Sequence, residues 1–150
     1  MKKYTALFFF IVLVGAAALF ARQFPPGPFY ELLSKPAWTP PNWLFGPVWA
    51  VLYLMIAFAG WTVWRAQGLG PALGLWFLQL ALNGAWSWIM FGQRMLTHAL
   101  VDIAALWIAI LAFIIVSWPV RRTASLLFFP YLFWITYAAA LNFELWRLNG

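Results

Sequence analysis

Five long apolar stretches fill most of this chain, and they restrict it to helices that cross a membrane. A helix needs about 20 apolar residues to span a hydrocarbon layer of about 30 Å, and inside lipid it must satisfy its own backbone hydrogen bonds. The stretches cover residues 5–21, 47–64, 71–91, 96–118 and 123–146. They predict an all-α integral membrane protein, a single domain over residues 1–150 in which five transmembrane helices form a bundle.

Charge and composition agree with a membrane location. The chain is 66% hydrophobic and 8% charged, whereas a soluble domain is about half apolar and a quarter charged. The net charge of +6 comes from basic residues that lie mostly near the ends of the stretches. This placement favours contact with lipid headgroups over nucleic acid. The basic residues divide almost evenly between the two sides, so the orientation stays open. Lys2 and Lys3 precede the first apolar stretch, as basic residues do in a secretory signal peptide. Because this stretch is long for the apolar region of such a signal, we expect the helix to be retained.

The connection between the first two stretches, residues 22–46, is much longer than the others. It contains Pro36, Pro40 and Pro41 beside several aromatic residues. Proline inside a helix removes a hydrogen bond and clashes with the preceding turn, while tryptophan suits the boundary between water and an apolar region. We therefore expect a rigid loop that acts as a lid over a flat apolar ligand. The remaining connections are short, so consecutive helices should be antiparallel neighbours.

The third stretch has two distinct faces. Residues three, four or seven apart share a helix face. One face is polar and aromatic and contains Gln79, Asn83, Trp86, Ser87 and Met90. We expect it to turn inward, because amides are costly in lipid. The other face is formed by small residues, which allow close helix contact: Gly70, Gly74, Ala81 and Ala85. It predicts packing against another helix, either of a second subunit or of the same chain.

Aromatic residues share a face on two further stretches. Trp49 and Tyr53 lie one turn apart on the second, and Tyr131, Trp134 and Ala138 do so on the fifth. Ala138 is small and leaves room for a ligand beside Trp134. Each face suits either core packing or ligand contact, and the sequence alone leaves both open.

Ionisable residues give little support for an enzyme. Asp102 follows His98 and Arg94 at intervals of four residues, so it is either a functional carboxylate or paired with a neighbouring base. The chain contains three acidic residues, one histidine and no cysteine. We therefore expect no protein-held metal ion. The nucleophile elbow, phosphate loop and dinucleotide motif are absent from the sequence.

Several segments resemble, in the same order along the chain, those of the translocator protein family, also called tryptophan-rich sensory proteins or peripheral benzodiazepine receptors. The similarity extends from about Phe29 to Asn149. Its segments are FYE at 29–31, KPAWTPP at 35–41, GPVWAVLY at 46–53, QLALNGAWS at 79–87, PYLFW at 130–134 and LNFELWR at 141–147.

The resemblance implies a five-helix bundle with a ligand pocket beneath the first loop. It implies binding of porphyrin or haem and of benzodiazepine-type ligands, with no obligatory cofactor, in a homodimer. The matching segments place Trp49 and Trp134 as paired pocket tryptophans. They place Tyr30, Trp38, Pro40, Pro41 and Phe45 in the lid. They place Tyr53, Asn83, Trp86 and Ala138 in the pocket wall.

One family motif is altered. The sterol motif contains a tyrosine, but its positions here are Leu141, Phe143 and Arg147. Because the tyrosine hydroxyl is missing and such motifs are weak, we do not expect cholesterol binding. The resemblance favours a bacterial-type member in the cell membrane.

Three functions follow as hypotheses. The first is a tetrapyrrole receptor or sensor, because a planar macrocycle gains from burial and from stacking on indoles. The second is light-dependent porphyrin breakdown in which Trp49 and Trp134 are the catalytic residues. The third is transport of tetrapyrrole or sterol, but the sequence contains no evident inverted repeat or broken span.

Overall fold

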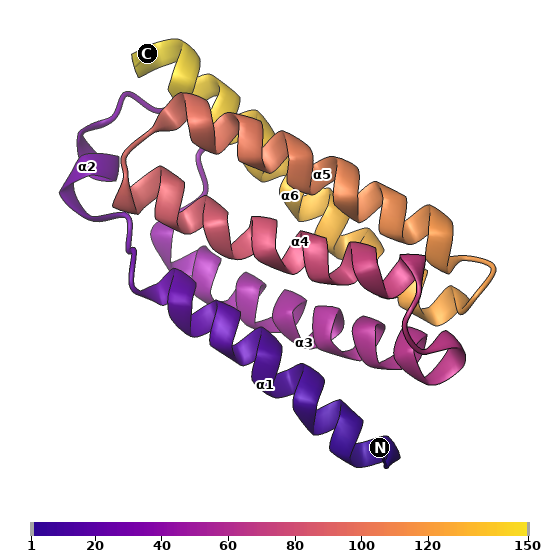
Figure 1. Ribbon diagram of the computed structural model, residues 1–150. Coiled ribbons are helices and arrows are strands. Elements are labelled where there is room, and N and C mark those ends of the chain that lie inside the picture. The colour runs from indigo at the N-terminus through magenta and orange to yellow at the C-terminus, as the bar shows by residue number, and fades with distance from the viewer. Residues whose placement is uncertain (1, 150) are drawn as a thin grey trace.

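The structure is a computed structural model that describes residues 2–149, and all regular structure within them is helical. The elements are α1 (Lys3–Arg22), α2 (Gly27–Leu32), α3 (Asn42–Gln67), α4 (Pro71–Ser87), the π-helical turn η1 (Trp88–Gly92), α5 (Leu96–Ser117) and α6 (Arg122–Asn149). Five long helices lie side by side, and α2 projects at one end near the C-terminus (Figure 1). Four of them, α1, α3, α5 and α6, are long and apolar enough to cross a membrane.

The third predicted stretch, 71–91, corresponds to two elements rather than one. α4 has 17 residues, which at about 1.5 Å per residue is short for the hydrocarbon layer. The π-helical turn η1 follows at once and extends the helical path to Gly92.

The connection between α1 and α3 differs from the prediction in two ways. Residues 22–46 were expected to lack regular structure, but the segment contains the short helix α2. The second helix was expected to begin at Pro47, but α3 begins at Asn42, after Pro41 in extended conformation, and Pro47 lies inside it. The helix therefore starts five residues before the predicted position. Pro47 is the sixth residue of α3, so its missing N–H removes one backbone hydrogen bond close to the start of the helix.

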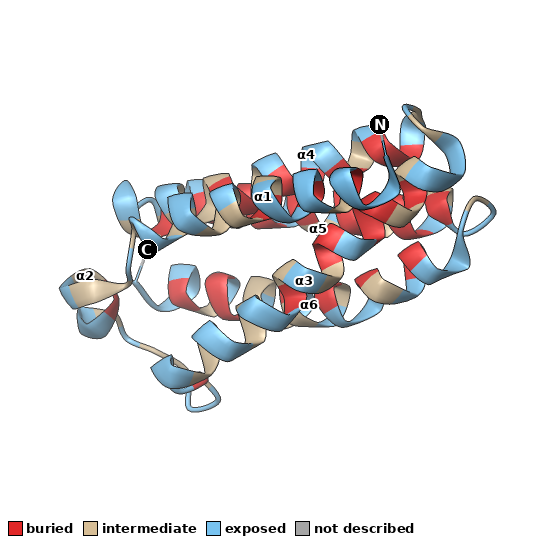
Figure 2. Cartoon of the chain, turned by 90° about the horizontal axis from the view of Figure 1, so that it is seen from below, coloured by how far each residue is buried: buried red, intermediate tan, exposed pale blue. Residues whose placement is uncertain are grey.

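The outward faces of the helices are apolar. Figure 2 shows buried positions turned toward the bundle interior and exposed positions on the outside. The exposed positions include large side chains that suit lipid contact, such as Phe8, Val101, Ile108 and Phe133. Inside, α5 packs on α4 and α6, while α1 packs on α3 and α4.

The half of the bundle away from α2 is filled by aromatic side chains. Trp76 is fully buried and meets Phe10 edge to face, with ring centroids 5.0 Å apart. Phe113 and Phe128 are also fully buried, with centroids 4.2 Å apart. The interior of this half is therefore solid.

Gly60 of α3 leaves room for the Trp76 indole of α4 in this half. The Trp76 indole lies over Gly60 and donates its N–H to the Ile56 carbonyl at 2.8 Å. A Cβ on Gly60 would lie 2.5 Å from Trp76 Cε2. The position therefore has no room for any side chain.

The two predicted faces of α4 have different surroundings. Gln79, Asn83 and Met90 are buried in the interior. On the small-residue face, Gly74 and Ala81 are exposed, while Gly70 and Ala85 are half-buried. Ala81 and Ala85 line an open groove between α1 and α4. The assignment of this face to a dimer interface stays a prediction.

Candidate ligand-binding pocket

The half of the bundle near α2 contains a cavity of about 580 Å³. This volume lies within the range of about 300–1,000 Å³ that is usual for small-molecule sites. Its lining is mostly apolar and comes from every long helix and from α2. The residues are Ala18, Ala21, Arg22, Phe24, Pro25, Pro26, Tyr30, Phe45, Gly46, Trp49, Ala50, Tyr53, Asn83, Trp86, Ser87, Phe91, Ile103, Leu106, Trp134, Ile135, Ala138 and Leu141.

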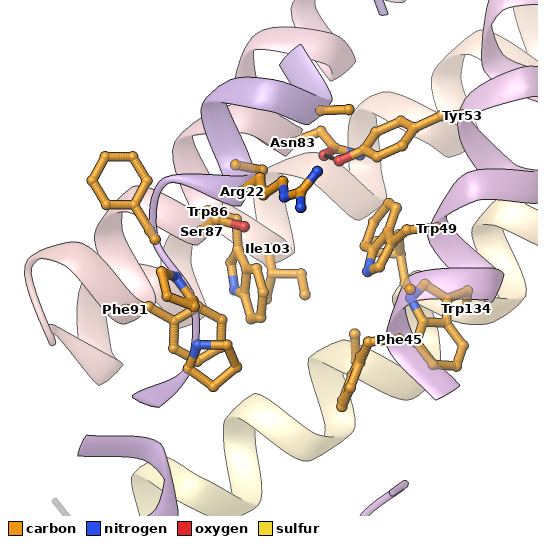
Figure 3. A pocket seen from close by; sticks show the side chains of 18 of the residues that line it. Arg22, Phe45, Trp49, Tyr53, Asn83, Trp86, Ser87, Phe91, Ile103 and Trp134 are labelled. Atoms are coloured by element: carbon orange, nitrogen blue, oxygen red, sulfur yellow. Dashed lines mark hydrogen bonds between the residues drawn. The ribbon is translucent and has the colours of Figure 1, made fainter. Parts of the chain in front are cut away.

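Aromatic rings form two opposing walls of this cavity. Figure 3 shows Trp49, Trp134 and Phe45 on one side and Trp86 with Phe91 on the other. The first wall joins α3 and α6, and the Phe45 and Trp134 ring centroids are 5.9 Å apart. In the second wall, the Trp86 and Phe91 centroids are 5.5 Å apart. The open space between the walls suits a flat apolar molecule.

Hydrogen-bonded side chains link the three helices α3, α4 and α6 beside the cavity. Asn83 donates to the Tyr131 hydroxyl at 2.6 Å, and Tyr131 donates to Gln79 Oε1 at 2.9 Å. Tyr53 donates to Asn83 Oδ1 at 3.4 Å. A separate bond joins the Trp86 N–H to Asn142 Oδ1 at 3.0 Å. These bonds explain why amide side chains occur in so apolar a chain, because each amide has a partner.

Replacing Tyr131 by phenylalanine should destabilise the protein without emptying the core. The ring stays, but Asn83 and Gln79 each lose a buried partner, which costs about 1–3 kcal/mol. We expect a lower thermal unfolding midpoint in detergent. Thr136→Val is the control, because it also removes a hydroxyl with two partners, the Trp107 N–H and the Leu132 carbonyl, but on an exposed part of α6. An unchanged midpoint for Tyr131→Phe would show that the bonds contribute nothing to stability.

One donor on the aromatic wall has no partner. The Trp134 indole N–H is buried and forms no hydrogen bond within residues 2–149. An unpaired buried donor is unfavourable, and an acceptor on a bound molecule would satisfy it.

The mouth of the cavity includes Tyr30 of α2. Burial, and secondarily the proximity of Tyr137, raise the pKa of the Tyr30 hydroxyl. The hydroxyl is therefore protonated at neutral pH and can donate.

Of the site residues predicted from the sequence, most lie together in this cavity. Eight do so: Tyr30, Phe45, Trp49, Tyr53, Asn83, Trp86, Trp134 and Ala138. Trp38, Pro40 and Pro41 do not line it. Trp38 lies over α6 instead, where its ring meets Tyr137 and its carbonyl accepts the Tyr137 hydroxyl.

The three positions of the altered sterol motif do not act together. Leu141 lines the cavity, whereas Phe143 is exposed and Arg147 pairs with Glu144 at 2.6 Å. The three positions point in different directions because residues two apart on a helix lie on different faces.

The sequence interpretation missed the contribution of α1 and α5 to the pocket wall. Ala18 and Ala21, one turn apart, leave space beside the cavity, and Ile103 and Leu106 form part of its lining. The three-residue spacing of both pairs indicated a shared helix face. Small and aliphatic residues are too common in membrane helices to mark a site.

The ionisable group around Asp102 differs from the prediction. Asp102 is buried, and its Oδ2 atom has no hydrogen-bond partner among the described residues. His98 and Arg94 are exposed. Arg94 precedes α5 and has a positive φ of 58°, so the expected helix face does not extend to it. The described residues contain no group of three His, Cys, Asp or Glu side chains that could hold a metal ion.

Apolar helices of membrane length and an aromatic-lined internal cavity define the class of this molecule: a small helical membrane protein with an internal cavity. The chain belongs to the TspO/MBR family, whose model matches residues 6–147.

Similar proteins occur in bacteria and animals. Protein CrtK of Rhodobacter capsulatus is 37% identical, over 93% of this chain and 90% of its own length. The tryptophan-rich sensory protein of Cereibacter sphaeroides is also 37% identical, over 93% and 89%. The human translocator protein is 39% identical, over 80% of this chain and 74% of its own length.

Proposed function

We propose that this protein is a membrane receptor or sensor that binds a porphyrin or haem in the cavity, and benzodiazepine-type ligands at the same place. The observation that supports this most directly is the pair of facing aromatic walls, which suit a planar macrocycle through stacking and burial. The unpaired Trp134 N–H adds a donor for a ligand acceptor. A relative named as a sensory protein agrees with the role of receptor.

The proposed arrangement has five membrane spans, with α4 and η1 together forming the third. Lipid covers the outward faces, and the groove on α1 and α4 joins two copies in a homodimer. We place it in a bacterial cell membrane, and we propose neither an obligatory cofactor nor sterol binding.

The proposal is tested by quenching of tryptophan fluorescence with protoporphyrin IX in the dark, followed by absorbance of the same sample under light. Saturable quenching with a stable porphyrin spectrum supports a receptor. Absence of saturable quenching would rule out this ligand.

Loss of the porphyrin bands under light would favour the second candidate, light-dependent porphyrin breakdown. The observation in its favour is that Trp49 and Trp134 line the same cavity. Both indoles would then lie against a bound porphyrin and within reach of the oxygen species that it generates.

We further propose that the segment between α1 and α3 is a lid over the cavity. Two contacts with α6 support this role. Asn149 makes a reciprocal pair with Ser34: the Ser34 N–H donates to Asn149 Oδ1, and Asn149 Nδ2 donates to the Ser34 carbonyl, each at 2.9 Å. Farther along, the Tyr137 hydroxyl donates to the Trp38 carbonyl.

Replacing Asn149 by alanine should loosen this lid and speed ligand release several-fold. Both bonds to Ser34 are lost, and each contributes about 1 kcal/mol. The rate is measured by recovery of tryptophan fluorescence after loaded protein is mixed with excess empty micelles. Gln93→Ala is the control, because Gln93 is exposed near the same end of the bundle. Equal release rates in Asn149→Ala and wild type would show that the two bonds between Asn149 and Ser34 do not hold the lid.

A further inference from the structure

One charged side chain lies among the apolar residues of the cavity. Among the described residues that line it, Arg22 is the only one with a formal charge. Figure 3 shows its guanidinium pointing into the space between Trp86 and Trp49. Glu31, Asp102 and Glu144 are the three acidic residues of the chain, and none of them lines the cavity.

The charge of Arg22 is not neutralised within the protein. The ion pair found within residues 2–149 joins Arg147 and Glu144, and Arg22 makes none. Arg22 is the last residue of α1 and is exposed at the cavity mouth. An anion can therefore reach it while an apolar body fills the space beyond.

Lys35 and Asn83, two other polar side chains near the cavity, already have hydrogen-bond partners. Lys35 Nζ donates to the carbonyls of Glu31 and Leu33, at 3.0 and 3.2 Å, and lies 4.9 Å from the Tyr30 ring centroid. The Asn83 amide is bonded to Tyr131 and Tyr53. The geometry therefore leaves Arg22 as the available cation at the cavity.

We propose that Arg22 selects ligands whose flat apolar body bears a carboxylate at its edge, and that it holds this carboxylate at the mouth of the cavity. The inference rests on the proposed function and specifies the chemical class of ligand. An arginine fork matches the two oxygens of a carboxylate, and such a charge-assisted pair is stronger than a hydrogen bond between neutral groups. The ring then enters between the aromatic walls with its acidic edge outward.

The test compares protoporphyrin IX, which has two carboxylates, with its neutral dimethyl ester. Binding is measured in the dark in phosphatidylcholine nanodiscs, with empty nanodiscs as the partition blank. We expect the wild type to prefer the acid by about tenfold, the value of one charge-assisted bond. Arg22→Gln should reduce the acid-to-ester ratio to about one. Arg94→Gln, which removes the same charge from an exposed residue outside the cavity, should retain the preference.

Each other outcome is decisive. Equal binding of acid and ester by the wild type would overturn the inference and leave the proposed function intact, whereas no binding of either porphyrin would overturn the proposed function itself. An equal fall in Arg94→Gln would assign the effect to net charge and contradict a role for Arg22. If the wild-type preference for the acid over the ester disappears when phosphatidylglycerol is added, Arg22 binds lipid headgroups instead. That result would also contradict the proposed role of Arg22.

Discussion

Protoporphyrin IX should bind at least about tenfold more weakly when Trp49 or Trp134 is replaced by alanine. Each substitution removes a ring from the cavity wall, together with its buried area and its stacking energy of about 0.5–1.5 kcal/mol. Tenfold corresponds to about 1.4 kcal/mol, so loss of the ring contacts is sufficient. The measurement is the fluorescence titration in the dark.

A matched control is available on the same helix as Trp49. Trp43 lies in the first turn of α3, is 72% exposed and does not line the cavity. Trp43→Ala should leave the affinity near that of wild type. If Trp49→Ala and Trp134→Ala also bind like wild type, the ligand does not lie between these walls.

Phenylalanine at the same two positions separates binding from chemistry. Trp49→Phe and Trp134→Phe keep an aromatic ring for stacking but remove the easily oxidised indole. Under light, loss of breakdown with retained binding is the result expected of catalytic indoles. Breakdown at the wild-type rate in both variants would exclude them from that role.

The second large effect is expected far from the cavity, at Gly60. Gly60→Ala would place a methyl group 2.5 Å from Trp76 Cε2. Trp76 is fully buried and bonded to the Ile56 carbonyl, so it cannot move without losing that bond and disturbing the solid half of the core. Overpacking of this kind costs about 1–3 kcal/mol, which in a chain of this size lowers the thermal midpoint by about 5 °C.

Gly74→Ala provides the opposite case. Gly74 is in α4, and a Cβ there would meet nothing within 4 Å. Alanine is favoured over glycine inside a helix by about 1 kcal/mol, so this variant should be as stable as wild type or slightly more stable. Unfolding followed by circular dichroism in detergent compares the two. Equal midpoints would show that α3 and α4 can separate to accommodate Gly60→Ala.

The helices could be predicted because each long apolar run must satisfy its own backbone in lipid. The start of α3 could not be predicted. The general rule that proline disrupts a helix does not show that Pro47 is tolerated about one turn inside this one. The aromatic pocket residues on α3, α4 and α6 were predictable because unusual side chains shared a face and matched family segments. Ala18 and Ala21 were not, because their contribution depends on how α1 packs beside α3 and α4.

The hollow and solid halves of the bundle have a consequence for the side of the membrane from which a ligand can enter and leave. The cavity opens near α2 and extends inward as far as Tyr53 and Asn83, while Trp76, Phe113 and Phe128 fill the interior beyond. In the proposed receptor, we therefore expect a molecule that enters at the α2 end to leave by the same end. Occupancy of the proposed site should then follow the ligand concentration on that side of the membrane and be independent of the concentration on the opposite side.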